Sequence, residues 1–160
     1  MRIQTIKRGM TLIEMIVTLT LFGVTSLGVI TAYITASKQT ERAMLKSETV
    51  TVARIVTDTL LKDIQRAKNV SWADPVLTVT LYNDIVVTYT TENTAKGKRI
   101  TRDGTPVVTS DYADISFVTS PAPLIDTYAK EVRLSLQIVV TRESVTETSV
   151  FNLTGHWRNI

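Results

Sequence analysis

One stretch near the start of the chain decides the fold, and it reads KRGMTLIEMIVTLTLFGVTSLGVITAYITAS over residues 7–37. From Met10 to Ser37 the only charged side chain is Glu14. A helix needs roughly 20 apolar residues to cross a bilayer, and this stretch exceeds that length. The sequence therefore predicts one membrane-spanning helix at residues 10–37.

The residues before this stretch form a short, polar and basic leader, residues 1–9, which contains Arg2, Lys7 and Arg8. A secretory signal peptide has an apolar core of about 7 to 15 residues that ends in small residues at a cleavage site. The apolar stretch here is longer and continues into a polar helical pattern, so we expect it to remain on the protein. Basic residues before a spanning helix hold that end in the cytoplasm, which places residues 38–160 outside.

The charge of the chain depends on this leader. The chain has 18 basic and 15 acidic residues, a formal net charge of +3, and three of the basic residues lie in the leader. Without the leader, 15 basic residues would stand against 15 acidic ones, so the basic composition is no signature of nucleic-acid binding. There is no cysteine, which excludes disulfides, thiolate metal sites and cysteine nucleophiles.

The helical pattern continues beyond the apolar stretch, because neither Gly nor Pro occurs between Gly28 and Pro75. Apolar residues recur there at spacings of seven and then four, which is the pattern of a helix with one buried face. They are Leu45, Val52, Val56, Leu60 and Ile64. We predict an amphipathic helix over residues 38–68 whose apolar stripe packs on a sheet.

After Pro75 the pattern changes to runs of β-branched residues, which are typical of strands. The predicted strands are Val76–Tyr82, Ile85–Thr91, Arg99–Arg102, Ile115–Thr119, Val132–Thr141 and Val145–Leu153. Asn83–Asp84 and Asp103–Gly104 lie between such runs as two-residue turns, so consecutive strands are expected to pair antiparallel. The predicted fold class is α+β: a long N-terminal helix packed on a C-terminal antiparallel β-sheet at residues 76–154.

The segment KRGMTLIE, residues 7–14, resembles the class III signal of type IV pilins and pseudopilins. In that family a prepilin peptidase cuts after the glycine and methylates the new N-terminus, and a glutamate aids assembly. The resemblance implies that Gly9 is the last leader residue, Met10 the new N-terminus and Glu14 the assembly residue. The implied partners are other pilins through the N-terminal helix, the prepilin peptidase and an inner-membrane assembly platform.

Elementary chemistry agrees with these roles. A carboxylate within a spanning helix costs on the order of 2.5 to 3.5 kcal/mol, so Glu14 needs a partner. Cleavage after Gly9 frees the α-amine of Met10, and N-methylation keeps its positive charge. The Met10 amine of one subunit and Glu14 of a neighbour can then pair in a medium of low dielectric constant, where their attraction is strong.

The C-terminal half, with KRITR at residues 98–102 and GHWRN at residues 155–159, looks most like the minor J-type pseudopilins and related minor pilins. Those proteins help to start or cap the assembly of a filament. The resemblance implies a single-pass inner-membrane protein, with its N-terminus cytoplasmic, that later enters a pilus or a type II secretion-like pseudopilus. A major, filament-forming pilin is the alternative.

Two further features have more than one interpretation. Gly23 is a candidate point at which the helix loosens in a filament, or it permits close packing of neighbouring helices. Lys96, Lys98, Arg99 and Arg102 form a basic cluster. This cluster is either a solvated hairpin or a DNA contact of a competence-type minor pilin.

The remaining polar residues do not suggest catalysis. His156 is the only histidine and has no partner nucleophile nearby in the sequence. Asp103, Asp111 and Asp114 lack the close spacing of a calcium-binding loop. No catalytic triad, metal cluster or phosphate-binding loop occurs in the sequence. We therefore expect a structural protein that is no enzyme and has no metal or cofactor.

Overall fold

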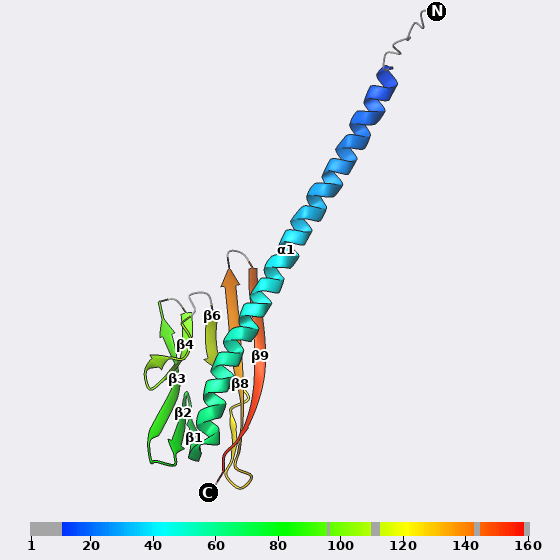
Figure 1. Cartoon of the computed structure of the whole chain (residues 1–160). Helices are drawn as coiled ribbons and strands as arrows, with labels where there is room; N and C mark the ends of the chain where they lie inside the picture. The colour runs from blue at the N-terminus through cyan, green and yellow to red at the C-terminus, as the bar shows by residue number, and fades with distance from the viewer. Residues whose placement is uncertain (1–10, 96, 110–112, 143–144, 159–160) are drawn as a thin grey trace, which may run out of the picture. The chain divides into compact units, whose positions relative to one another are not determined.

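The structure is a computed structural model, and it describes residues 11–95, 97–109, 113–142 and 145–158. The chain divides into two compact units, residues 1–41 and 42–160. The long helix α1 (Leu12–Gln65) begins in the first unit and ends in the second (Figure 1). All strands belong to the second unit.

The two ends of α1 have local causes. At its start, the side-chain oxygen of Thr11 accepts a hydrogen bond from the backbone N–H of Glu14, with 3.3 Å between the atoms. Thr11 therefore satisfies one of the free N–H groups of the first turn, as an N-cap residue does. At its end, the N–H of Arg66 bonds the carbonyl oxygen of Asp63 at 3.2 Å. The predicted extension of the helix to residue 68 is wrong, because a strand begins at Ala67.

One face of the second half of α1 is buried. The buried side chains are Leu45, Thr49, Val52, Ala53, Val56, Leu60 and Ile64. The predicted apolar stripe is thus confirmed. Thr49 is the polar member of this face, and its hydroxyl donates to the carbonyl oxygen of Leu45 at 2.9 Å, so burial leaves no unsatisfied group.

The first sheet is an antiparallel meander of five strands in sequence order. The strands are β1 (Ala67–Ala73), β2 (Val76–Leu81), β3 (Val86–Thr94), β4 (Gly97–Arg102) and β5 (Thr105–Pro106). The two predicted turns, Asn83–Asp84 and Asp103–Gly104, join β2 to β3 and β4 to β5. Asp84 (φ 59°), Asp103 (φ 51°) and Gly104 (φ 76°) adopt the left-handed conformation that such turns require.

The second sheet is built around a long central strand, β8 (Glu131–Arg142). One side of β8 pairs with β6 (Ala113–Phe117) and β7 (Leu124–Asp126), and the other side pairs along its full length with β9 (Val145–His156). Side chains join the two sheets. The N–H of Lys98 on β4 donates to Asp114 on β6 at 3.2 Å, and the N–H of Phe117 donates to the Thr91 hydroxyl at 3.3 Å.

The α+β fold class is therefore confirmed, with the strands arranged in two antiparallel sheets. The hydrophobic core combines the buried face of α1 with inward-facing residues of both sheets. The predicted start of the sheet at residue 76 is wrong, since β1 comes first, and the sheet region ends at His156. The very short strands β5 and β7 were also missed.

Candidate assembly site

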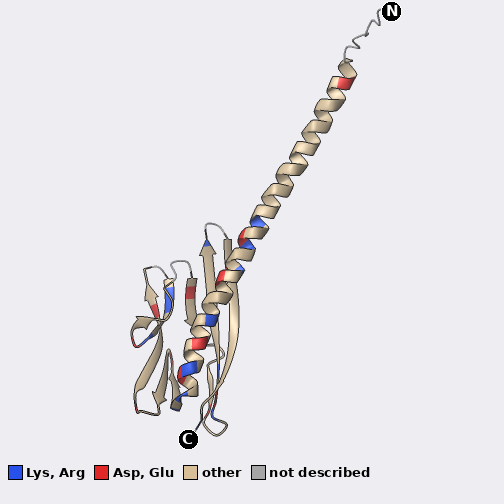
Figure 2. Cartoon of the chain, in the orientation of Figure 1, with Lys and Arg blue, Asp and Glu red and all other residues tan. Residues whose placement is uncertain are grey.

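The first half of α1 exposes apolar side chains on all its faces. From Leu12 to Ile34 the large hydrophobic residues are between 49% and 79% exposed. Figure 2 shows a long stretch of this region without charged residues, and in the sequence none occurs between Glu14 and Lys38. In the described part of the chain, α1 is the one helix long and apolar enough to cross a membrane. A helix that is apolar all round suits a lipid environment.

The hydroxyl groups in this apolar region are satisfied within the helix. The side chains of Thr18, Thr20, Thr25 and Thr31 each donate to the carbonyl oxygen four residues earlier, at 2.8 to 3.0 Å. Unsatisfied polar groups are costly in hydrocarbon, and these internal bonds remove that cost. The five threonines between residues 11 and 31 are therefore compatible with a membrane segment.

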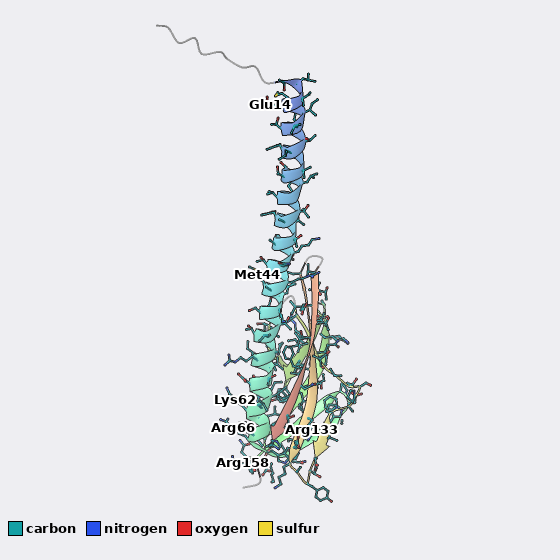
Figure 3. All side chains as sticks on the ribbon, turned by 90° about the vertical axis from the view of Figure 1, so that its right-hand side faces the viewer. Glu14, Met44, Lys62, Arg66, Arg133 and Arg158 are labelled. Atoms are coloured by element: carbon teal, nitrogen blue, oxygen red, sulfur yellow. The ribbon has the colours of Figure 1, made fainter. Side chains whose placement is uncertain are left out.

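Glu14 lies in the first turn of α1, three residues after the N-cap residue Thr11 (Figure 3). The motif Thr-Leu-Ile-Glu thus has the spacing of a capping box, in which the acidic residue follows the N-cap by three positions. A carboxylate in this turn interacts favourably with the helix dipole. The Glu14 side chain is exposed, so it is available to a second molecule. Gly9 and Met10 lie outside the described residues.

Gly23 lies within an unbroken helix, since α1 runs continuously from Leu12 to Gln65. A Cβ atom built on Gly23 or Gly28 would meet nothing within 4 Å. The isolated chain therefore places no neighbour against either glycine. Both interpretations of Gly23, local loosening and close packing between subunits, remain predictions.

The predicted basic cluster is not gathered on one surface. Lys98 and Arg99 are consecutive in β4 and therefore point to opposite faces of the sheet. Arg102 shares the face of Lys98, but its Nε donates to the carboxylate of Asp63 at 2.8 Å. Lys96 lies outside the described residues. DNA contact by this cluster stays a prediction.

Asp63 forms a polar junction between α1 and the first sheet that the sequence did not reveal. Its side chain is 13% exposed, and its Oδ2 accepts hydrogen bonds from the Tyr89 hydroxyl at 2.6 Å and from Arg102 Nε at 2.8 Å. Burial and the bond to Asp63 raise the pKa of Tyr89, and the bond to Asp63 raises the pKa of Arg102. These contacts span 26 and 39 residues, so no local pattern indicates them.

A metal site would need several donor side chains close together. Among the described residues, no group of three His, Asp or Glu side chains is placed to hold a metal ion. The absence of a cofactor and of enzymatic activity remain expectations from the sequence.

Comparison with known proteins identifies the N-terminal segment. Residues 5–30 match the family model described as the prokaryotic N-terminal methylation motif. This match supports a type IV pilin-like protein. The motif implies processing by a prepilin peptidase, and together with the apolar helix it fits a single-pass inner-membrane protein. No curated protein and no solved structure matches the chain.

Proposed function

We propose that this chain is a minor pilin or pseudopilin, a structural subunit that helps to start or cap the assembly of a type IV pilus or type II secretion-like pseudopilus. One observation carries the proposal. The methylation motif over residues 5–30 coincides with an exposed apolar helix whose first turn holds a lone carboxylate, Glu14.

Assembly then follows from the charges. Before processing, Glu14 lies within the apolar stretch without a charged neighbour in the sequence up to Lys38. Cleavage after Gly9 gives each subunit a methylated, positively charged amine at Met10. A subunit that enters the filament pairs this amine with Glu14 of its neighbour, which satisfies two charges that are costly to leave unpaired in an apolar medium.

The sequence of the C-terminal unit supports a minor rather than a major subunit. The segments at residues 98–102 and 155–159 resemble minor J-type pseudopilins, and a chain without cysteine cannot form the disulfide-closed loop of many major pilins. A major pilin is the second candidate. The DNA-binding alternative has less support, because Arg102 bonds Asp63 and consecutive basic residues point to opposite faces.

The proposal is tested by intact-protein mass spectrometry of membrane and filament fractions. We expect the filament form to begin at Met10 and to carry one methyl group, and we expect far fewer copies of it than of the main filament subunit. Retention of Met1 in assembled filaments would contradict the processing. A copy number equal to that of the main subunit would identify a major pilin.

A further inference from the structure

The strand β9 leaves a long edge of the second sheet open. It pairs with β8 from Val145 to His156, and among the described residues it has no strand on its other side. Edge strands carry unpaired N–H and C=O groups that can pair with another chain. The open edge of β9 therefore carries such unpaired backbone groups.

The register shows which residues of β9 turn their backbone groups outward. The N–H of Trp157 bonds the carbonyl oxygen of Lys130 at 3.0 Å, so the next pair, Glu131 and His156, is a non-hydrogen-bonded pair. Bonded and non-bonded pairs alternate along an antiparallel ladder. The outward groups consequently belong to the even-numbered residues, which are Thr146, Thr148, Val150, Asn152, Thr154 and His156.

A second hydrogen bond supports this assignment. The N–H of Val118 bonds the carbonyl oxygen of Ser135, so the odd-numbered residues of β8 face β6 and its even-numbered residues face β9. The six outward residues of β9 also have exposed side chains. The open edge thus presents backbone donors and acceptors at every second residue over the whole strand.

Two of the usual protections of an edge strand, proline and lysine, are missing from β9. Its sequence, VTETSVFNLTGH, contains no Pro, Lys or Arg. Its one acidic residue, Glu147, is odd-numbered and belongs to the bonded side. Natural sheets commonly protect an open edge with proline, lysine or a bulge. An edge that lacks these features suits the addition of another strand.

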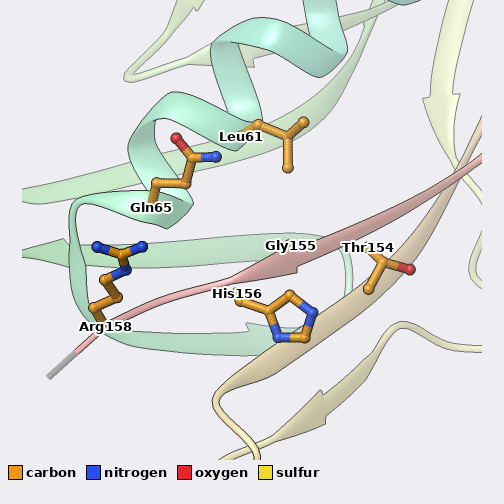
Figure 4. A pocket seen from close by; sticks show the side chains of 6 residues that line it. All are labelled: Leu61, Gln65, Thr154, Gly155, His156 and Arg158. Carbon is orange, nitrogen blue, oxygen red and sulfur yellow. The ribbon is translucent and has the colours of Figure 1, made fainter.

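A groove of about 630 Å³ lies at the C-terminal end of this edge, between the last turns of α1 and the end of β9 (Figure 4). It is lined by Leu61, Gln65, Thr154, Gly155, His156 and Arg158. A Cβ atom on Gly155 would lie 3.0 Å from a methyl group of Ile64, so glycine permits this close approach of strand and helix.

The charged side chain that lines this groove is Arg158, and no carboxylate lines it. Lys62 in the last turn of α1 and Arg66 just after the helix are exposed, and Figure 3 shows both at the same end of the unit as Arg158. Among the described residues, neither Lys62, Arg66 nor Arg158 forms an ion pair.

The backbone pattern decides between two kinds of partner. Lys62 and Arg66 interact favourably with the dipole at the C-terminal end of α1. Basic residues alone would bind the phosphates of DNA as well as a carboxylate of a peptide. The two-residue repeat of N–H and C=O groups, however, matches the backbone of an extended peptide. The groove lies beside the end of this edge, so it can receive the end of a strand that is added to β9.

We propose that the open edge of β9 and the adjoining groove bind an extended peptide segment of another filament subunit, which adds a strand parallel to β9 and places a carboxylate at its C-terminal end beside Arg158. The source of the segment rests on the proposed function. The peptide-binding chemistry does not, because it depends on the residues of the second unit alone.

The test uses full-length protein in detergent micelles and a fluorescent peptide in which Thr and Val alternate before a C-terminal Asp with a free carboxylate. We expect saturable binding by fluorescence anisotropy. The same peptide with every backbone amide N-methylated has no N–H donor on either edge, so it cannot add a strand and should not bind. A peptide that ends in a lysine amide should bind at least about tenfold more weakly, since it loses a charge-assisted hydrogen bond.

Two variants and their matched controls locate the site. Val150→Pro removes one outward N–H and should abolish binding, whereas Val150→Thr keeps that N–H and should not. Arg158→Glu should weaken binding at least about tenfold, whereas Lys46→Glu makes the same charge change about 28 Å along the helix from Gln65 and should have no effect. Thermal melts show whether each variant is folded, and the N-methylated peptide provides the same test in the unchanged protein.

Several outcomes would overturn the proposal. They are no peptide binding at millimolar concentration, binding that tolerates N-methylation, and salt-dependent binding of duplex DNA in place of the peptide. The proposed function is tested separately by Glu14→Ala. If that variant assembles normally while the peptide still binds to β9, the assembly mechanism fails and this inference stands.

Discussion

Replacing Tyr89 with Phe should destabilise the second unit through the loss of one hydrogen bond. Tyr89 is fully buried, and its hydroxyl lies 2.6 Å from Oδ2 of Asp63. The phenylalanine ring nearly preserves the volume of the side chain, so a large cavity is not created. Asp63 also keeps its bond from Arg102, so the carboxylate is not left unpaired.

The magnitude follows from the type of bond. A hydrogen bond to a charged group contributes about 1.5 to 3 kcal/mol to the free energy of unfolding. For a unit of this size, that loss corresponds to a decrease of roughly 5 to 12 °C in Tm. The measurement is a thermal melt by circular dichroism. Tyr128→Phe is the matched control, because Tyr128 is 98% exposed and should melt like the wild type.

The pH dependence gives an independent check. The pKa of Tyr89 is raised in the folded protein, first by burial and then by the bond to Asp63. A tyrosine in the unfolded chain ionises near pH 10. Above that pH the unfolded state loses a proton that the folded state keeps, so the free energy of unfolding decreases as pH rises, by up to about 1.4 kcal/mol per pH unit.

The stability difference between wild type and Tyr89→Phe should therefore be constant below pH 9 and should shrink between about pH 10 and 11. Phenylalanine cannot ionise, so the variant lacks this contribution. A Tm of Tyr89→Phe within about 1 °C of the wild type at pH 7 would refute the role of the hydrogen bond. A difference that does not change between pH 8 and 11 would refute the raised pKa of Tyr89 in the folded protein.

Three further substitutions test other parts of the molecule. Glu14→Ala should leave Tm unchanged but reduce co-purification with other pilins at matched membrane levels, with Glu41→Ala as the control. Equal recovery of the other pilins with Glu14→Ala and wild type would exclude Glu14 as the assembly contact. Leu60→Ala should lower the free energy of unfolding by about 2 to 5 kcal/mol in a denaturant titration, because Leu60 is fully buried, and a loss below about 1 kcal/mol would contradict its place in the core. Gly97→Ala should destabilise by more than about 1 kcal/mol, because φ is 114° and the new Cβ would lie against the Asp114 carboxylate; an unchanged Tm would show that β4 can shift.

The elements that the sequence predicts are those with a strong local period. The buried residues from Leu45 to Ile64 recur with the period of a helix, and those of β8 and β9 recur at every second residue, as in a strand. Each period can be read from neighbouring residues in the sequence, so these elements are identified without the structure. The strand β1 was missed because Ala67 and Lys68 favour a helix and Asn69 favours a turn. Its conformation comes from pairing with β2, a contact that local propensity does not contain.

The functional residues likewise divide into those that the sequence identifies and those that it does not. Glu14 is identified from the sequence, because a carboxylate in an apolar stretch is conspicuous wherever it occurs. The junction of Asp63, Tyr89 and Arg102 is not identified from the sequence. Its members are separated by up to 39 residues, and none of them interrupts the pattern of the helix or strand to which it belongs. The outward residues of β9 also require the register, which one hydrogen bond beyond the strand fixes.

The two halves of α1 have different surroundings, and this separates stability from assembly. Residues such as Leu60 lose their surroundings when the second unit unfolds, so substitutions there change Tm. Residues near Glu14 are exposed in the isolated chain, and unfolding of the second unit removes no contact from them. Their free energy depends on the lipid and on other subunits. A defect in assembly of Glu14→Ala with a normal melt is therefore the expected signature of a residue that acts between molecules.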